Sequence, residues 1–200
     1  VECMVVKDIV TQQMAMQSGQ GHVMSLQDGK TLSEMKKLGF NIIQYPAGTS
    51  LLVPDSNNPD SVFADIRVRQ AINYAIDKKA VADATGYGYM FPSSQLPPLG
   101  NPARNTAIPD NSYDLGKAKD LLTQAGHSTG FKTRLITWSY DVNYALVVQQ
   151  QLAKVGIECN LENLDNLKFI DLWMNGGEGG LLCLSQSFGP NFAGAFKSQF

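Results

Sequence analysis

A strand, a helix and a second strand follow one another directly between residues 131 and 161, and this unit most constrains the fold. Residues 131–138 are rich in β-branched and aromatic side chains, and residues 143–155 repeat apolar side chains at helical spacing. Gly156 ends that helix, and residues 157–161 alternate apolar with polar side chains, as a half-buried strand does. Strands that are joined by a helix pair in parallel. The unit therefore predicts an α/β protein with helices packed on a sheet.

Two other apolar runs are predicted to join the same sheet as strands. Residues 1–6 (VECMVV) favour a buried strand, and residues 181–185 (LLCLS) favour another. Residues 41–53 form a further extended run, which a Pro-Ala-Gly turn at residues 46–48 interrupts. We expect the sheet to contain strands at residues 1–6, 131–138, 157–161 and 181–185.

The stretch from Asp65 to Gly86 predicts two consecutive amphipathic helices with a boundary at Asp77. Apolar side chains of the first helix recur at helical spacing and define one buried face. They are Val68, Ala71, Ile72, Ala75 and Ile76. Asp65 and Asp77 stand where an N-cap acceptor is needed, and Gly86 can supply a left-handed residue at the C-terminal end. Comparable signals predict helices at residues 8–19, 30–38, 114–125 and 167–173.

Charge balance and cysteine content exclude several functional classes. Lys and Arg number 16 against 18 Asp and Glu, and a net charge of -2 provides no basic field for nucleic acid or anionic membrane. Cys3, Cys159 and Cys183 are odd in number and lack Cys-x-x-Cys spacing, so we interpret them as small core residues and expect no metal site. No run approaches the ~20 apolar residues that cross a bilayer. No cofactor is expected.

Segments that resemble enzyme motifs do not form a catalytic constellation. The segment SQSFG at residues 185–189 differs from the Gly-x-Ser-x-Gly nucleophile elbow at its first position, and both His22 and His127 precede it. The Gly-Tyr-Gly at residues 86–88 lacks the third glycine of a dinucleotide-binding loop and follows a helix instead of a strand. We therefore assign no catalytic residues and expect that the protein is not an enzyme.

Three motifs occur in a fixed order along the chain. They are VRQAINYAIDKKAV at residues 68–81, YDLGKAKDLLTQAG at residues 113–126 and LAKVGIECNL at residues 152–161. Together they resemble the extracytoplasmic solute-binding proteins of ABC importers, specifically family 5, the peptide/nickel class. The resemblance implies one lobe of a periplasmic-binding-protein type II fold, with helices flanking a mixed sheet. It also implies that residues 1–200 are a single α/β lobe of a larger, two-lobe protein.

The same resemblance implies a function. The intact protein is expected to capture a small solute, a peptide or peptide-like molecule, by closing two lobes around it, and to deliver it to ABC permease subunits in the membrane. Its partners are then the solute, the permease and the missing lobe of the same chain, and its location is extracytoplasmic. An alternative keeps the fold as a sensor or interaction domain fused to a regulator. An upstream signal peptide would favour the first function, and an upstream DNA-binding domain the second.

Two segments are predicted to approach the solute. Trp138, Ser139 and Tyr140 lie where a strand passes into a helix N-terminus, a place suited to aromatic packing, although Trp138 is equally expected as a core residue. Residues 90–111 contain five prolines and few periodic apolar side chains, which predicts a long surface loop. In the family that this chain resembles, the corresponding loop leads towards the ligand cleft.

The C-terminal segment 182–190 occupies the place of the family's Trp-x-x-Asp-Tyr-x-x-Pro motif. With Pro190 as the reference, Cys183 falls at the aromatic position, Gln186 at the Asp and Ser187 at the Tyr. In peptide binders of the family this Asp pairs with the free ammonium of the ligand, which the neutral Gln186 cannot do. We therefore expect a solute without a free N-terminus, such as a sugar, a blocked peptide or a metal chelate. The predicted ligand-binding residues are Trp138, Ser139, Tyr140, Cys183, Ser185, Gln186, Ser187 and Phe188.

Overall fold

The computed structural model describes residues 2–6, 8–26, 28–45, 48–110, 112–175 and 180–187. Its helices are α1 (Ile9–Gln17), α2 (Gly29–Lys37), the short 3₁₀ helix η1 (Val62–Ala64), α3 (Ile66–Ala75), α4 (Lys78–Gly86), α5 (Leu115–Gln124), α6 (Val142–Ala153) and α7 (Asn166–Asn175). Its strands are β1 (Gly48–Pro54), β2 (Phe131–Trp138), β3 (Ile157–Leu164) and β4 (Leu181–Ser187). The predicted helix pair and the predicted strand–helix–strand unit are therefore confirmed.

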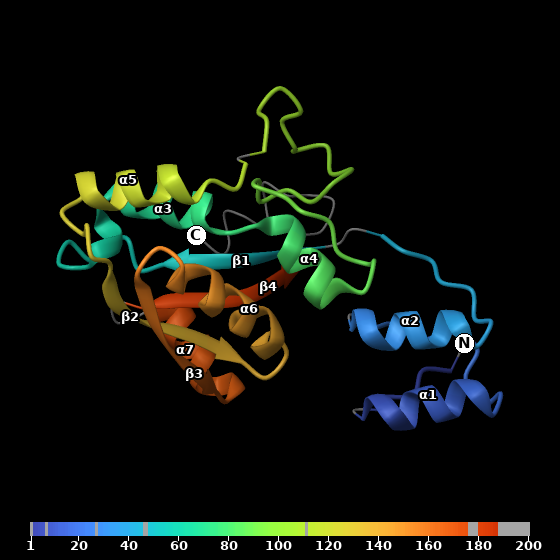
Figure 1. The fold of residues 1–200 in the computed structure, drawn as a ribbon. Helices are drawn as coiled ribbons and strands as arrows, with labels where there is room; N and C mark the ends of the chain where they lie inside the picture. The colour runs from blue at the N-terminus through green and yellow to red at the C-terminus, as the bar shows by residue number, and fades with distance from the viewer. Residues whose placement is uncertain are drawn as a thin grey trace.

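The strands form one mixed sheet in the order β1-β4-β2-β3 (Figure 1). β2 is parallel to both of its neighbours, and Leu135 in β2 lies opposite Leu181 in β4. β1 is antiparallel to β4, so Gly48 at its start lies opposite Ser187 at the end of β4. The helix α6 connects β2 to β3, as the predicted parallel pairing requires.

The prediction of a strand at residues 1–6 is wrong. The described residues 2–6 form no strand, and Val5 is 91% exposed. The strand that pairs with β4 is β1, and successive side chains of β1 point to opposite faces of the sheet. Val53 packs against one hydrophobic cluster and Leu52 against the other. An apolar run alone does not determine which strand it joins, because strand pairing depends on residues far away in the sequence.

Side chains on the two faces of the sheet belong to separate hydrophobic clusters. In β2, Leu135 belongs to the larger cluster and its neighbour Ile136 to the smaller one. Residues of α3, α5 and α6 complete the larger cluster, whereas Phe169 of α7 completes the smaller one. Each large side chain that is fully buried contributes about 1.5–3 kcal/mol to stability. Helices therefore cover both faces of the sheet, as Figure 1 shows.

The aspartates predicted to begin the central helices do so. The side chains of Asp65 and Asp77 accept hydrogen bonds from backbone N–H groups in the first turns of α3 and α4. The end of α4 differs from the prediction, because Gly86 is still helical. The left-handed residues are Tyr87 and Gly88, with φ angles of 50° and 87°.

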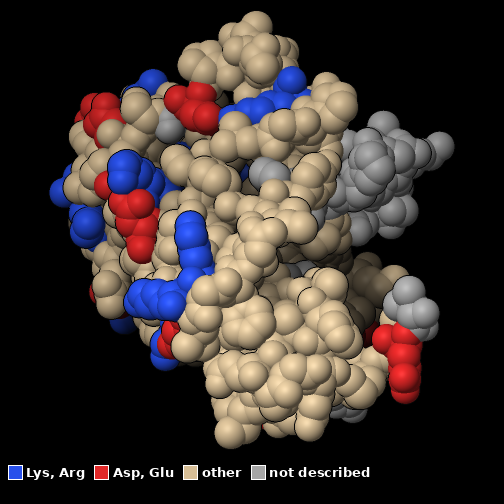
Figure 2. All heavy atoms as spheres, turned by 90° about the vertical axis from the view of Figure 1, so that its right-hand side faces the viewer, with Lys and Arg blue, Asp and Glu red and all other residues tan. Residues whose placement is uncertain are grey.

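α1 and α2 lie beside the sheet and not on it (Figure 1). α2 contacts α4, and a Cβ on Gly29 would lie 2.4 Å from the carbonyl oxygen of Gly86. Glycine at position 29 therefore permits this close helix contact. None of the nine described residues of α1 is buried, and residues 9–26 contain no charged side chain. Figure 2 views this side of the molecule and shows a broad surface of uncharged residues.

Ala71 offers a test of the core. It lies in α3 and is 0% exposed, so Ala71→Asp places a carboxylate without a partner in the larger cluster. We expect circular dichroism to show cooperative thermal unfolding in the parent and not in the variant. Ala84→Asp is the matched control, because Ala84 is exposed on α4. Cooperative unfolding of Ala71→Asp at the parent's temperature would contradict this description of the core.

Candidate functional site

Strand ends from separate parts of the chain meet at one edge of the sheet. Trp138 is the last residue of β2, and Ser185 and Ser187 lie near the end of the parallel strand β4. β1 begins at the same edge, where Ser50 lies opposite Ser185 and Gly48 opposite Ser187. In α/β sheets, ligands commonly bind beyond the carboxyl ends of the parallel strands. The structure thus brings the two predicted segments, 138–140 and 185–187, to a common edge.

Asp141 connects these strand ends, and sequence reasoning missed it. The residue lies in the turn between β2 and α6 and is 6% exposed. Its carboxylate accepts a hydrogen bond from the indole N–H of Trp138, and others from the backbone N–H and the hydroxyl of Ser185 at 2.8 and 2.7 Å. The Ser185 hydroxyl in turn lies 2.9 Å from that of Ser50. A polar chain therefore links β2, β4 and β1.

Trp138 belongs partly to the core and partly to the candidate site. Its ring stacks on Phe169 with a centroid distance of 5.2 Å, and Tyr140 packs edge-on against it at 5.6 Å. The side chain is only half-buried, while Ser139 and Tyr140 are exposed, Tyr140 to 80%. Trp138 is therefore held by the rings around it, and Tyr140 is the more exposed of these aromatic side chains.

The predicted residues of β4 divide between the core and the surface. Cys183 is 0% exposed in the larger cluster, so its thiol faces the core. Burial, with a smaller contribution from Asp141, raises the pKa of this thiol well above its ordinary value and keeps it protonated. Gln186 is half-buried and Ser187 is exposed at the strand end. Phe188 lies outside the described residues, as does Pro190, which set the register of this segment.

The long loop also reaches this edge. Its described residues 90–110 contain neither helix nor strand, as the sequence predicted. The hydroxyl of Thr49 in β1 donates a hydrogen bond to the backbone carbonyl of Leu96 at 2.8 Å. Because Thr49 lies opposite Gln186 in the sheet, the loop lies beside the end of β4. The loop therefore lies beside the candidate site.

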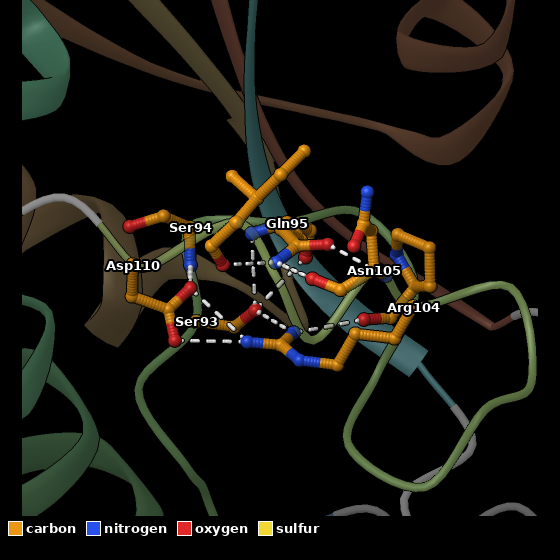
Figure 3. Close-up of polar contacts among 8 residues, drawn as sticks. Ser93, Ser94, Gln95, Arg104, Asn105 and Asp110 are labelled. Atoms are coloured by element: carbon orange, nitrogen blue, oxygen red, sulfur yellow. Dashed lines mark hydrogen bonds and ion pairs between the residues drawn. The ribbon is translucent and has the colours of Figure 1, made fainter.

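Polar contacts among its own residues cross-link the loop (Figure 3). The guanidinium of Arg104, 10% exposed, donates hydrogen bonds to the Ser93 hydroxyl at 2.7 Å and to the Asp110 carboxylate at 2.8 and 3.1 Å. The side-chain amide of Gln95 donates to the backbone carbonyls of Asn105 and Ile108, both at 3.0 Å. Both ends of the loop are thus tied together without regular secondary structure.

A separate hollow lies at the other end of β2. Its volume is about 440 Å³, and its lining includes Asp60, Val62 and residues 132–134. Within it, Arg134 pairs with Glu162 at 2.8 Å. None of the predicted ligand-binding residues that the structure describes lines this hollow. We therefore place the candidate site at the carboxyl edge of the sheet, where those residues and the loop meet.

Two other kinds of site have no support in the described part of the chain. Those residues include no group of three or more His, Cys, Asp or Glu side chains able to hold a metal ion. They also include no helix long and apolar enough to cross a membrane.

Comparisons with known proteins identify the family of this chain. The family model described as bacterial extracellular solute-binding proteins, family 5 Middle, matches residues 1–193. Over 165 residues the chain is 28% identical to heme-binding protein A of Haemophilus influenzae. The matched segment covers 78% of this chain and 30% of that protein. Over 154 residues it is 29% identical to the dipeptide-binding protein of Escherichia coli K12. This second match covers 73% of this chain and 29% of that protein.

The solved structures include a periplasmic binding protein with a similar fold. The ABC transporter-associated periplasmic binding protein DppA from Helicobacter pylori, in complex with the peptide STSA, superposes with a TM-score of 0.75 at 26% identity. The match covers 91% of this chain and 36% of that one, so this chain spans about a third of the length of its relatives. The predicted fold class, a mixed sheet flanked by helices of the type II periplasmic-binding-protein fold, is confirmed.

The polar network of the loop can be tested by proteolysis. Arg104→Gln removes charge-assisted hydrogen bonds that join both ends of the loop, so we expect chymotrypsin to cleave residues 90–110 at least about tenfold faster. Arg67→Gln is the control, because it removes a guanidinium from the helix α3 and leaves the loop contacts unchanged. Equal cleavage rates in the parent and in Arg104→Gln would show that this network does not order the loop.

Proposed function

This chain belongs to the bacterial extracellular solute-binding proteins of family 5, and from that premise we propose that residues 1–200 form one α/β lobe of a two-lobe, solute-capturing protein. The solute is enclosed between this lobe and the missing lobe of the same polypeptide. The closed protein then delivers it to ABC permease subunits in the membrane, and works outside the cytoplasm. Closure of domains around a ligand is a hinge motion that the energy of binding drives.

One observation carries this proposal: one edge of the sheet is assembled from segments far apart in the sequence. The turn after β2, the end of β4, the start of β1 and the loop near Leu96 meet there. The edge offers an exposed aromatic ring, Tyr140, and polar side chains at Ser185 and Gln186. Small-molecule sites commonly combine aromatic surface with a few polar groups that fix the ligand's orientation. One lobe supplies only part of the enclosing surface, and the second lobe supplies the rest.

We propose a peptide or peptide-like solute without a free N-terminus. One relative is named a dipeptide-binding protein, and the Helicobacter pylori structure holds a peptide. Gln186 stands where the resemblance to the family places an Asp. Its neutral amide offers one acceptor and two donors, which suit a carbonyl, an amide or a hydroxyl. It cannot neutralise an ammonium group that closure removes from water. A blocked peptide, a sugar or a metal chelate fits this requirement.

The polar contacts of the site favour binding without catalysis. The hydroxyl of Ser185 donates to the carboxylate of Asp141 and has no imidazole as a base among the described residues. His127 packs against Phe131, at the opposite end of β2. Since the serine of a Ser-His-Asp site gives its proton to an imidazole, we propose that these residues bind a solute and do not transform it.

The choice of solute can be tested on the full-length gene product by calorimetry. Free and N-acetylated di- to pentapeptides are titrated, and we expect the acetylated forms to bind at least as tightly as the free forms. Gln186→Asp is expected to improve binding of the free forms by about 1.5–3 kcal/mol, the value of a charge-assisted hydrogen bond. Gln150→Asp, on the exposed side of α6, is the matched control. Tight binding of free peptides by the parent, lost on acetylation, would refute this assignment of Gln186.

A further inference from the structure

We propose that Asp141 is a positioning residue, which fixes the indole of Trp138 and the backbone of Ser185 so that two strand ends present one rigid surface to the solute. The proposal rests on the proposed function only in naming the carboxyl edge as the solute-facing edge. The positioning itself follows from contacts within the chain.

The hydrogen bonds of Asp141 show what its carboxylate does. A carboxylate that is 6% exposed requires donors around it, because burial without them is costly. The described donors are the Trp138 indole N–H and both the backbone N–H and hydroxyl of Ser185. Hydrogen bonds to a charged acceptor are stronger and better oriented than those between neutral groups. Asp141 therefore joins two strand ends that belong to segments 44 residues apart.

Asp141 makes these contacts instead of capping its own helix. It occupies the N-cap position of α6, but its side chain makes no capping hydrogen bond. At the comparable positions of α3 and α5, Asp65 and Asp114 accept from backbone N–H groups of the first turn. An N-cap hydrogen bond typically stabilises a helix, so the carboxylate of Asp141 has a tertiary partner in place of a local one.

The hydrogen bond to Asp141 fixes the orientation of the Trp138 ring at the proposed solute-facing edge. Phe169 stacks on one side of the indole, and Tyr140 packs edge-on against it. Packing alone permits the ring to slide, whereas the hydrogen bond from its N–H to Asp141 fixes its position in the plane. Tyr140, which is 80% exposed, then rests on a fixed platform. Ser185 is fixed through the same carboxylate and carries the link on to Ser50.

The contacts of Asp141 also limit its own role toward the solute. A carboxylate has about four acceptor positions. Three are occupied by the described donors, and the residue is nearly inaccessible. Asp141 is therefore not the group that neutralises a cationic solute, although it lies beside the site. Its effect on binding passes through Trp138 and Ser185.

Nuclear magnetic resonance on the 200-residue chain tests this proposal without any solute. The two tryptophans, Trp138 and Trp173, give separate indole N–H signals, and their hydrogen exchange is measured in the parent. We expect the Trp138 signal to exchange at least about tenfold more slowly than that of Trp173, because a charged acceptor holds it. Equal rates in the parent would overturn the proposal, whatever any variant does.

Asp141→Asn is then compared with Asp165→Asn. Asp165 is the matched control, since it also follows a strand and precedes a helix, is exposed, and accepts hydrogen bonds from Leu167 and Lys168. We expect Asp141→Asn alone to accelerate exchange at Trp138 and to shift the Ser185 amide signal, with Trp173 unchanged. Unchanged signals at both residues would overturn the proposal. Faster exchange of the whole chain would also overturn it, because Asp141 would then contribute only general stability. Failure of the peptide titration above would leave these results unaffected.

Discussion

The central position of β2 between two parallel neighbours decides where the strand ends of this sheet gather. Because β3 and β4 both run parallel to β2, the carboxyl ends of all three strands lie at one edge. The antiparallel strand β1 begins at that edge and adds its own first residues. Helices cover both faces of the sheet, so the strand ends are where its backbone groups remain accessible. This pairing brings together the strand ends of the candidate site, at residues 138, 185–187 and 48–50.

Local signals allowed a large part of the fold to be predicted from the sequence. An aspartate followed by an apolar helical repeat marks the starts of α3 and α5, because the cap and the first turn are neighbours in the chain. The parallel pairing of β2 with β3 was predictable for the same reason, since a helix of known length separates them. The place of β1 was not, because VECMVV and GTSLLVP are both apolar runs and only contacts with β4 distinguish them.

The candidate site was predictable only in outline. Periodicity cannot tell which side of β4 carries the site, because residues 181–184 are all buried and both faces of the strand are covered. The motif register set by Pro190 predicts Cys183 at the site, whereas its thiol faces the core. The sequence does not predict the role of Asp141, because its partner Ser185 is distant in the chain. Its sequence position is that of an ordinary helix cap, and its hydrogen bonds to Ser185 depend on a strand that follows much later in the chain.

The site combines rigid and reachable groups in a way that suits recognition of a small solute. Trp138 and Asp141 are held by packing and hydrogen bonds, while Tyr140 and Ser187 extend into solvent. The loop beside them is ordered by the contacts of Arg104 and Gln95 in place of regular secondary structure. Groups that are already held in place lose little conformational entropy when a ligand binds, which leaves more of the interaction energy for affinity.

Hydrogen–deuterium exchange of the full-length gene product, with and without a saturating pool of N-acetylated di- to pentapeptides, tests the central claim most directly. If the carboxyl edge of the sheet is the solute-facing surface, peptide binding will slow exchange at residues 138–141, 185–187 and 48–50. Slower exchange confined to residues 58, 60–62 and 132–134, which line the hollow at the other end of β2, would contradict it.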